Sequence, residues 1–256
     1  MVNRNNVPVP AEVRVIGLAG LPELEQGDDL AALLADAAAR SGGLEYGDVV
    51  VVAQKAVSKV EGRIISLDEV EPSARAVELA GDEGDPRQVE VILRESVEVV
   101  RSRPPLVISE TRHGFVCASA GVDASNAKGP GSLILLPVDP DASAMALRVR
   151  LEELTGVAPG VIVSDSFGRA WRQGTTDVAL GVAGIAALHD LRGTHDARGY
   201  ELRSTMIAVA DEIAGAAELV MGKSRDIPAA IVRGVDAPGA GRGSDLVMPR
   251  VRDLFR

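Results

Sequence analysis

The sequence predicts an α+β fold made of two closely packed subdomains. Strand-like apolar runs and capped helices mix irregularly along the chain, and several strand-like runs are adjacent to one another. A strictly alternating parallel fold would place a helix after every strand. No internal repeat or low-complexity linker divides the 256 residues, a length at the upper edge of one domain. We therefore treat residues 1–256 as a single functional unit, with a tail at 236–256.

A strand and a helix are predicted in the first forty residues. Residues 12–18 (EVRVIGL) alternate between polar and apolar side chains, as a half-buried strand does. The stretch GLPELEQGDDL is a shaped loop, and Asp28 near its end is expected to cap an Ala/Leu-rich helix that runs to about Arg40. Such a loop can offer free backbone N–H groups to a phosphate. Because it lacks the glycine fingerprint of a dinucleotide site, a plain connector is the simpler interpretation of these residues alone.

The next predicted element is a buried strand followed by a polar loop. Residues 48–53 (DVVVVA) are almost wholly apolar, which predicts a strand covered on both faces. The segment QKAVSKVEGR then places Gln54, Lys55 and Lys59 beyond the end of that strand. We expect a loop here, which either faces a nucleotide or forms a solvated hairpin.

The middle of the chain is predicted to contain two capped helices and several short strands. Asp85 and Asp139 are each followed by proline, which combines an N-cap with a favoured first helical residue. The second of these helices is expected to end at Gly156 in a left-handed cap. Two short strands broken by consecutive prolines are expected within 97–109, and further strands in FVCASAG and LILLP.

The last third of the chain is predicted to hold one long helix and one strand. The run 178–188 consists of small apolar residues, so backbone elements can approach closely there. An amphipathic helix is expected from about Thr205 and a final strand at 228–234. Two histidines lie on the intervening loop without a carboxylate or thiol at metal-ligand spacing, so we expect them at the surface. The Pro/Gly/Arg-rich tail is expected to order late or on assembly.

Composition and charge narrow the functional class. The net charge of −10 argues against non-specific binding to nucleic acid, whose phosphates require a basic surface. The single cysteine, Cys117, excludes an intramolecular disulfide, fits a reducing compartment and is expected to be a buried structural thiol. The first residues lack the apolar core of a signal peptide, and no apolar run approaches 18 residues. A cytoplasmic protein that does not cross a membrane is the simplest expectation.

The stretch 161–174 (VIVSDSFGRAWRQG) carries the strongest chemical signal. Three β-branched residues predict a core strand, and Asp165 is expected at its end, where open α/β sheets place ligands. Arg169 and Arg172 supply fixed positive charge suited to a phosphate or carboxylate, so the segment suggests phosphoryl chemistry. The structural alternative is that Asp165 caps a turn, Arg172 pairs with it and Trp171 fills a gap.

The chain lacks the common motifs of other enzyme classes. The segment Gly222-Lys223-Ser224 resembles the end of a P-loop, but Ala217 occupies the position that requires glycine, and the segment ends a helix rather than beginning one. No H-E-x-x-H, C-x-x-C or G-x-S-x-G occurs.

Two acidic turns remain as candidates for a metal site. Asp123 in GVDASN and Asp165 in VSDSFGR are each flanked by hydroxyl or amide oxygens. Hard oxygen donors suit Mg²⁺ or Mn²⁺ rather than zinc, and such ions usually link a carboxylate to substrate phosphates. The alternative is that these Asp-x-Ser/Asn turns only cap themselves.

Five segments together resemble a known family. GLPELEQGDDL, QKAVSKVEGR, GVDASN, SDSFGRAWRQG and ADEIAGAAELVMGK occur in the order typical of coenzyme F420-0:L-glutamate ligases, over roughly 13–233. The resemblance implies GTP-dependent addition of glutamate to a deazaflavin coenzyme, one or two divalent ions (Mg²⁺ or Mn²⁺) and K⁺ as a further candidate. It also implies an intertwined homodimer of α+β chains unrelated to P-loop proteins, which work on small molecules and not on nucleic acid or membranes.

Motif matching carries the family's site residues onto this sequence. It implies that Asp123, Asp165 and Ser166 are metal ligands. It places the lining of the GTP site at Leu21, Pro22, Glu23, Leu24, Gln54, Lys59, Asn126, Met221, Gly222 and Lys223. Two residues depart from the pattern, because Gln54 replaces a serine of some members and Lys223 a glutamine able to ligate a second metal. A charged lysine cannot ligate, so the shell of a second ion would differ here.

The chemistry that the resemblance implies is amide-bond formation through an acyl phosphate. The terminal carboxylate of F420-0 would take the γ-phosphoryl group of GTP, and the α-amine of glutamate would then displace phosphate. Divalent ions at Asp123 and Asp165, with Arg169 or Arg172 nearby, would neutralise the crowded negative charge. No residue is assigned as a general base.

Alternatives stay open from the sequence. A ligase of the same fold could act on another carboxylate acceptor, and a non-catalytic module that binds a metal or a nucleotide for regulation would also lack an obvious acid–base residue. Some relatives carry a further C-terminal flavin-binding domain. Because this chain stops at Arg256, we expect the stand-alone form without that second activity.

Overall fold

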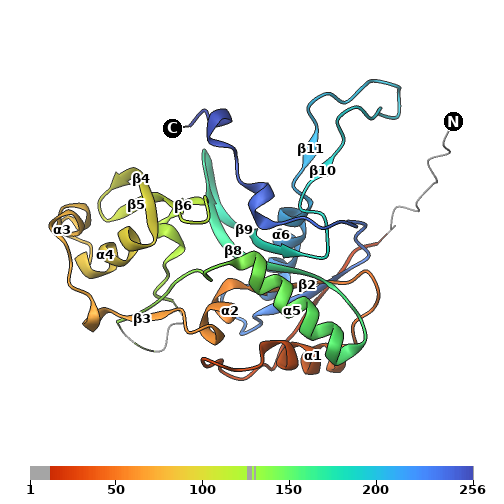
Figure 1. The fold of residues 1–256 in the computed structure, drawn as a ribbon, viewed down its shortest axis with the longest axis horizontal. Helices are drawn as coiled ribbons and strands as arrows, with labels where there is room; N and C mark the ends of the chain where they lie inside the picture. Colours follow the sequence, from red (N-terminus) through yellow and green to blue (C-terminus); the bar gives the residue numbers. More distant parts are fainter. Residues whose placement is uncertain (1–11, 126–128, 130, 256) are drawn as a thin grey trace.

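A five-stranded mixed sheet forms the centre of the computed structural model, which describes residues 12–125, 129 and 131–255 (Figure 1). Its strand order is β1-β12-β2-β8-β9. Strands β2 and β8 run parallel, whereas the other neighbours are antiparallel. The bounds are β1 (Arg14–Gly17), β2 (Val49–Ala53), β8 (Gly160–Arg169), β9 (Arg172–Ala183) and β12 (Ala229–Arg233).

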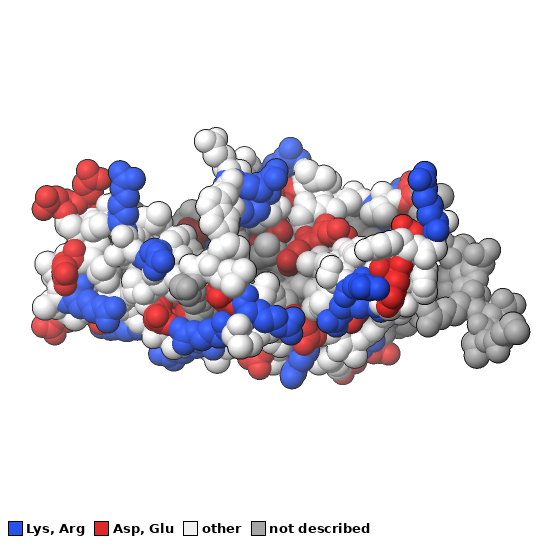
Figure 2. Space-filling view, turned by 90° about the horizontal axis from the view of Figure 1, so that it is seen from above, with Lys and Arg blue, Asp and Glu red and all other residues white. Residues whose placement is uncertain are grey.

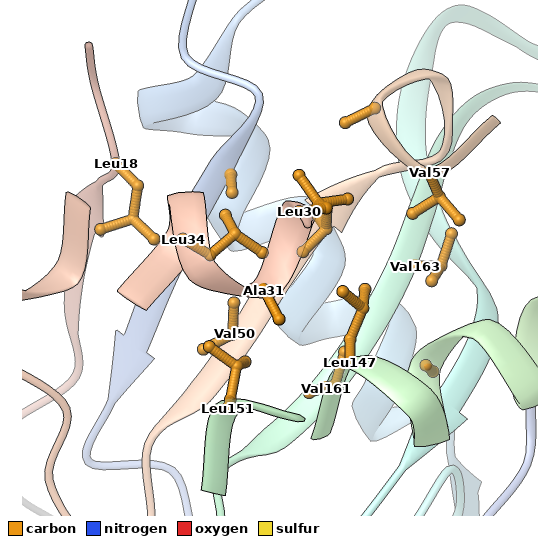
Figure 3. Packing of buried hydrophobic residues seen from close by; sticks show 14 of the residues in the cluster. Leu18, Leu30, Ala31, Leu34, Val50, Val57, Leu147, Leu151, Val161 and Val163 are labelled. Carbon is orange, nitrogen blue, oxygen red and sulfur yellow. The ribbon is translucent and has the colours of Figure 1, made fainter. Parts of the chain in front are cut away.

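Helices cover both faces of this sheet, so β2 is buried on both sides as its apolar sequence predicts. Alternate side chains of a strand point to opposite faces. Val50 therefore packs with α1 (Leu30–Arg40) and α5 (Pro140–Thr155), whereas Val51 packs with α6 (Val209–Met221). Figure 3 shows side chains of α1 and α5 meeting Val50 and Val161 on the first face.

A second hydrophobic core lies beside the main sheet, where α3, α4 and β4 to β6 gather at one end of the molecule (Figure 1). Its sheets are β3-β7 and β4-β5-β6. The elements are β3 (Ile64–Ser66), α3 (Ala74–Ala80), α4 (Pro86–Arg94), β4 (Ser96–Arg103), β5 (Leu106–Thr111), β6 (Val116–Ala118) and β7 (Ser132–Ile134). The chain therefore has one core around the five-stranded sheet and one within residues 64–135.

The remaining elements are short. They are α2 (Gln54–Val60), the hairpin of β10 (His189–Asp190) and β11 (Met206–Ile207), and the 3₁₀ helices η1 (Leu67–Glu69), η2 (Ser119–Gly121), η3 (Gly243–Leu246) and η4 (Arg250–Arg252). In the part of the chain that the structure describes, no helix is long and apolar enough to cross a bilayer. The fold is thus mixed, with several sheets and helices, which agrees with the predicted α+β class.

Three helix ends that depend on local chemistry lie where the sequence places them. The carboxylate of Asp85 accepts a hydrogen bond from the Arg87 N–H at the start of α4, and that of Asp139 accepts from the Ala142 N–H at the start of α5. Helix α5 ends at Gly156, which has a left-handed φ of 74°. These caps satisfy N–H and C=O groups that have no partner inside the helix, so a few neighbouring residues determine them.

Three predicted boundaries and one predicted type of element are wrong. Helix α1 is capped by Asp29 rather than Asp28, whose carboxylate instead accepts from the Glu25 N–H in the preceding turn. The segment that begins at Gln54 is a helix rather than a loop, and α6 begins at Val209 because Met206–Ile207 pairs in β11. The strand that carries Asp165 does not end there but continues to Arg169.

Tertiary packing explains the unexpected helix. Helix α2 has no side chain that caps its N-terminus, and its seven residues are too few to form a stable helix in isolation. Its inward side is nevertheless buried, because Ala56 and Val57 join the core of the main sheet. Burial of this face stabilises a helix that the polar sequence alone does not indicate.

Candidate active site

A cavity of about 1150 Å³ opens at the place where the two cores meet. Its walls come from the loop after β1, helix α2, the β6–η2 segment, the middle of the β8–β9 hairpin and the end of α6. The lining residues are 21–24, 53–56, 59, 117–119, 121–123, 125, 164–168, 177, 218, 221–223 and 226–228. This volume exceeds that of most sites for a single small ligand, so there is room for more than one substrate.

Most of the predicted site residues lie together in this cavity. Those in its lining are Leu21, Pro22, Glu23, Leu24, Gln54, Lys59, Asp123, Asp165, Ser166, Met221, Gly222 and Lys223. Asn126 is outside the described residues. Five segments that are far apart in sequence therefore share one site, as the five quoted motifs lead us to expect.

Arg169 and Arg172 are the exception among the predicted residues. Both lie at the exposed tip of the β8–β9 hairpin and outside the cavity lining, although Gly168 is within it. The Arg169 guanidinium donates to the Gln173 carbonyl at 3.1 Å. Among the described residues, no ion pair joins Arg172 to Asp165, so the structural alternative in which these two side chains pair is wrong.

Asp165 is partly buried on β8, with its side chain in the cavity. Burial raises the pKa of its carboxyl to about 7, and the nearby charges of Asp177 and Asp123 act in the same direction. The Ser166 N–H and the charge of Lys55 oppose this shift without cancelling it. Two further carboxylates thus lie close enough to Asp165 to disfavour its ionised form, and the positive charge nearby does not offset them.

Asp177 is a site residue that the sequence analysis missed. It lies on β9 directly opposite Ser166 and is only 5% exposed. Its carboxylate accepts hydrogen bonds from the Ser164 hydroxyl at 2.9 Å and the Ser166 hydroxyl at 2.7 Å. Ser166 therefore donates to Asp177, which leaves the oxygen lone pairs of that hydroxyl available to a cation.

Replacing Asp177 with asparagine is expected to lower turnover by about 10- to 100-fold, the usual effect of losing a group that orients metal ligands. Asparagine keeps one acceptor oxygen and replaces the other with an NH₂ donor, so one of the two serine hydroxyls loses the acceptor of its O–H. Steady-state kinetics on the folded variant would measure the effect. Asp190→Asn is the matched control, because Asp190 is exposed and pairs with Arg192 on a distant loop. Wild-type turnover in Asp177→Asn would contradict the positioning role.

Helix α2 supplies two lysines to the cavity, one helical turn apart. The Lys55 ammonium lies 2.6 Å from Asp123 Oδ2 and the Lys59 ammonium lies 2.5 Å from Glu23 Oε1. Burial acts to raise the pKa of Asp123, but hydrogen bonds from Lys55 and from the Ser125 N–H outweigh it, so this pKa lies below its usual value. Asp123 is therefore ionised at neutral pH.

Gln54, at the start of α2, contributes an unused hydrogen-bond donor. Its side chain is 1% exposed, and its Oε1 accepts from the Ser58 hydroxyl at 2.9 Å. Its Nε2 is buried and has no hydrogen-bond partner among the described residues, although the residue lines the cavity. A buried amide N–H without a partner costs about 1–3 kcal/mol, so a ligand oxygen at this position would be stabilised.

The chemistry of the donors fits a hard divalent cation. Asp123, Asp165, Ser166 and Asp177 offer only carboxylate and hydroxyl oxygens, which suit Mg²⁺ or Mn²⁺. Within the described ranges, no three His, Cys, Asp or Glu side chains are arranged as a ready-made metal site. The position beside Asp123 is instead taken by the Lys55 ammonium.

The cavity lining also contains a buried thiol and the residues at the end of α6. Burial and the charge of Asp165 raise the pKa of the Cys117 thiol to about 12, so this residue is protonated and is not a nucleophile, as predicted. Met221 ends α6, and Gly222 follows it with a left-handed φ of 56°. The Gly-Lys segment therefore comes after a helix, whereas a P-loop comes before one.

Fold and site together define a class of protein: a mixed α/β chain with a large open cavity lined by acidic, hydroxyl and lysine side chains. Figure 2 shows Asp/Glu and Lys/Arg side chains interspersed over the face seen from above. Such a face differs from the uniformly basic surface that nucleic acid requires.

Comparison with known proteins identifies the family. Residues 20–234 match the model of the family described as F420-0:Gamma-glutamyl ligase. The chain is 48% identical to the coenzyme F420:L-glutamate ligase of Methanopyrus kandleri, over 97% of this chain and 96% of that protein. It is 45% identical to the enzyme of the same name from Methanocaldococcus jannaschii, over 96% and 97% of the two chains. The chain belongs to the F420-0:gamma-glutamyl ligase family and is an enzyme of the ligase class.

Proposed function

We propose that this protein is a GTP-dependent ligase that joins the terminal carboxylate of coenzyme F420-0 to the α-amine of L-glutamate. GDP and phosphate are released, and further γ-glutamyl additions can follow. The observation that carries the proposal is the common cavity, which unites the loop 21–24, helix α2 and the Asp123 and Asp165 turns in a member of this ligase family. We place the enzyme in the cytoplasm as a homodimer, as its resemblance to the family implies.

The cavity supplies groups of both charges, as a reaction between anions requires. A carboxylate and a triphosphate repel each other, so their approach needs positive charge and hydrogen-bond donors. Lys55 and Lys59 provide ammonium groups from α2, and Gln54 provides a buried N–H donor. Lys223, which follows α6, lines the same cavity. These residues would bind and orient the nucleotide phosphates beside the substrate carboxylate.

The chemistry follows from the weakness of a carboxylate as an acyl donor. Transfer of the γ-phosphoryl group from GTP to the F420-0 carboxylate forms an acyl phosphate and GDP. The uncharged α-amine of glutamate then attacks the acyl carbon, phosphate leaves, and the amine proton passes to solvent. Catalysis of this kind depends mainly on positioning and electrostatic stabilisation, so no side chain is assigned as a general base.

A divalent cation would complete the charge balance of the site. Asp123, Asp165 and Ser166 would hold Mg²⁺ or Mn²⁺, with Asp177 orienting Ser166. Such an ion neutralises phosphate charge and orients the transferred group. A second divalent ion and K⁺ are further candidates, although Lys223 would supply no ligand to either while it is charged.

The direct test is a product analysis. Purified protein supplied with GTP, Mg²⁺ or Mn²⁺, L-glutamate and F420-0 is expected to yield GDP and a coenzyme heavier by one or more glutamyl residues in mass spectrometry. Parallel reactions with generic carboxylic acids in place of F420-0 test whether another acceptor serves. Saturable GTP binding without phosphate release, with all substrates present, would show a regulatory module instead and overturn the proposal.

A further inference from the structure

Lys55 is a charged residue of the cavity lining, and in the proposed reaction it is one of several cations that bind phosphate groups. It is the second residue of α2, and its side chain is 22% exposed, so most of it is enclosed by the cavity wall. Its ammonium lies 2.6 Å from Asp123 Oδ2 and 2.5 Å from the Ser125 hydroxyl oxygen. Asp123 is a proposed ligand of the divalent cation, so Lys55 occupies part of the space that a cation would need.

The electrostatics around Lys55 favour a cation at this position. The charges of Asp123 and Asp177 are close enough to the Asp165 carboxyl group to act on it. The Asp177 carboxylate accepts hydrogen bonds from two serine hydroxyls, and the Asp123 carboxylate forms an ion pair with Lys55. The Lys55 ammonium therefore offsets part of the negative charge of Asp123, Asp165 and Asp177, which together form the acidic cluster.

A lysine and a divalent cation cannot share Asp123 without a cost. Two positive groups at the same carboxylate repel each other, and the cation also needs the lone pairs that the ammonium now uses. The ammonium can leave Asp123 at low cost only if another anion accepts it. Gln54, which precedes Lys55 in α2 and lines the same cavity, has a buried amide N–H without a partner among the described residues, so an anionic ligand in this cavity would find a second unused donor.

We propose that Lys55 is the resident counter-cation of the acidic cluster, which yields Asp123 to a divalent cation when an anionic ligand accepts its ammonium group. The proposal rests on the proposed function only in taking that ligand to be a nucleotide phosphate. Lys55 is thus a positioning residue that makes cation binding and nucleotide binding favour each other. Because such coupling is reciprocal, each ligand increases the affinity for the other by the same factor.

The test measures Mn²⁺ binding to the full-length protein by electron paramagnetic resonance of the free ion, first with Mn²⁺ alone. Lys55→Met keeps the length of the side chain and removes its charge. This variant is expected to bind Mn²⁺ alone at least about 10-fold more tightly than the wild type, since removing a competing charge worth about 1.4 kcal/mol changes affinity by that factor. Lys55→Arg, which keeps the charge, is expected to remain within about 3-fold of the wild type.

Lys59→Met is the matched control. Lys59 is on the same helix, one turn further on, and pairs with Glu23 rather than with the acidic cluster. Its loss is expected to leave the affinity for Mn²⁺ alone unchanged. Circular dichroism on each variant shows whether the fold is retained.

The second part of the test repeats the titrations with a non-hydrolysable GTP analogue. In the wild type, the analogue is expected to tighten Mn²⁺ binding at least about 10-fold, and in Lys55→Met this gain is expected to be smaller, because only the direct attraction between Mn²⁺ and the phosphates remains. Equal affinities of folded wild type and Lys55→Met for Mn²⁺ alone, or no saturable Mn²⁺ binding by either, would overturn the proposal. If Lys55→Met binds Mn²⁺ more tightly but the analogue does not bind the wild type, the counter-cation role stands and the assignment of GTP falls.

Discussion

Replacing Asp165 with asparagine is expected to lower ligase turnover by about 10³-fold or more while leaving the protein folded. The amide cannot supply the negative charge that a divalent cation requires, and electrostatic stabilisation is the main source of catalysis in phosphoryl transfer. The amide has nearly the same size and shape as the carboxyl group, so the packing of β8 is preserved. Product formation measured by mass spectrometry would show the loss.

The same substitution is expected to stabilise the metal-free protein above neutral pH. The folded-state pKa of Asp165 is about 7, compared with 3.8 for an unperturbed carboxyl, so the folded protein binds this proton more tightly than the unfolded chain. Stability from this group is therefore present below about pH 4 and is lost as the pH rises through 7. Asparagine has no charge to bury, so Asp165→Asn should be more stable by about 2 kcal/mol at pH 8, allowing for partial exposure.

Thermal unfolding of both proteins at pH 5 and pH 8, without divalent ions, measures this difference. The stability advantage of Asp165→Asn should shrink at the lower pH, where the wild-type carboxyl is protonated. Added Mn²⁺ should raise the melting temperature of the wild type more than that of the variant, because only the wild type offers the full set of carboxylates. An Asp165→Asn protein that turns over normally would remove Asp165 from the site.

Replacing Gly181 with alanine is expected to destabilise the fold by about 3 kcal/mol or more. A Cβ atom at this position would lie 2.0 Å from the carbonyl oxygen of Pro140 and 2.2 Å from its carbonyl carbon. Both are backbone atoms at the start of α5, so no side-chain rotation can relieve the overlap, and β9 and α5 would have to move apart. The close packing of these two elements therefore depends on glycine.

Gly168→Ala is the matched control for this prediction. Gly168 lies on the neighbouring strand β8, and an added Cβ would meet no atom within 4 Å. Denaturant unfolding should show a lower midpoint for Gly181→Ala and little change for Gly168→Ala. A Gly181→Ala protein as stable as the wild type would show that α5 can shift away from β9 at little cost.

Much of the fold was predictable where short-range chemistry determines it. The N-caps at Asp85 and Asp139 and the C-cap at Gly156 each depend on a few adjacent residues, and all three are observed. The buried strand at 48–53 follows from an uninterrupted apolar run. Helix α2 was missed, because seven polar-looking residues carry no pattern that distinguishes a packed helix from a loop.

The site was predicted only in part. Asp123 and Asp165 were recognised as a pair, and the structure places both in one cavity. Asp177 was missed because its role comes from the register of the β8–β9 hairpin, which sets it opposite Ser166. That register follows from a turn at residues 170–171 and the register shift beside it, so a prediction of the hairpin with both features would have found it. The cavity roles of the two arginines of this hairpin, neither of which reaches the lining, remain predictions.

The sequence by itself determined the ligase family, the oxygen-rich donor set of the candidate site and the caps of α4 and α5, since residue types and nearby neighbours define these properties. Only the tertiary structure decided that Lys55 pairs with Asp123 and that Asp177 holds Ser166. Both contacts join residues brought together by strand register and by the packing of α2 against the main sheet. Such pairings depend on the burial of distant apolar surfaces, and local sequence carries little information about them.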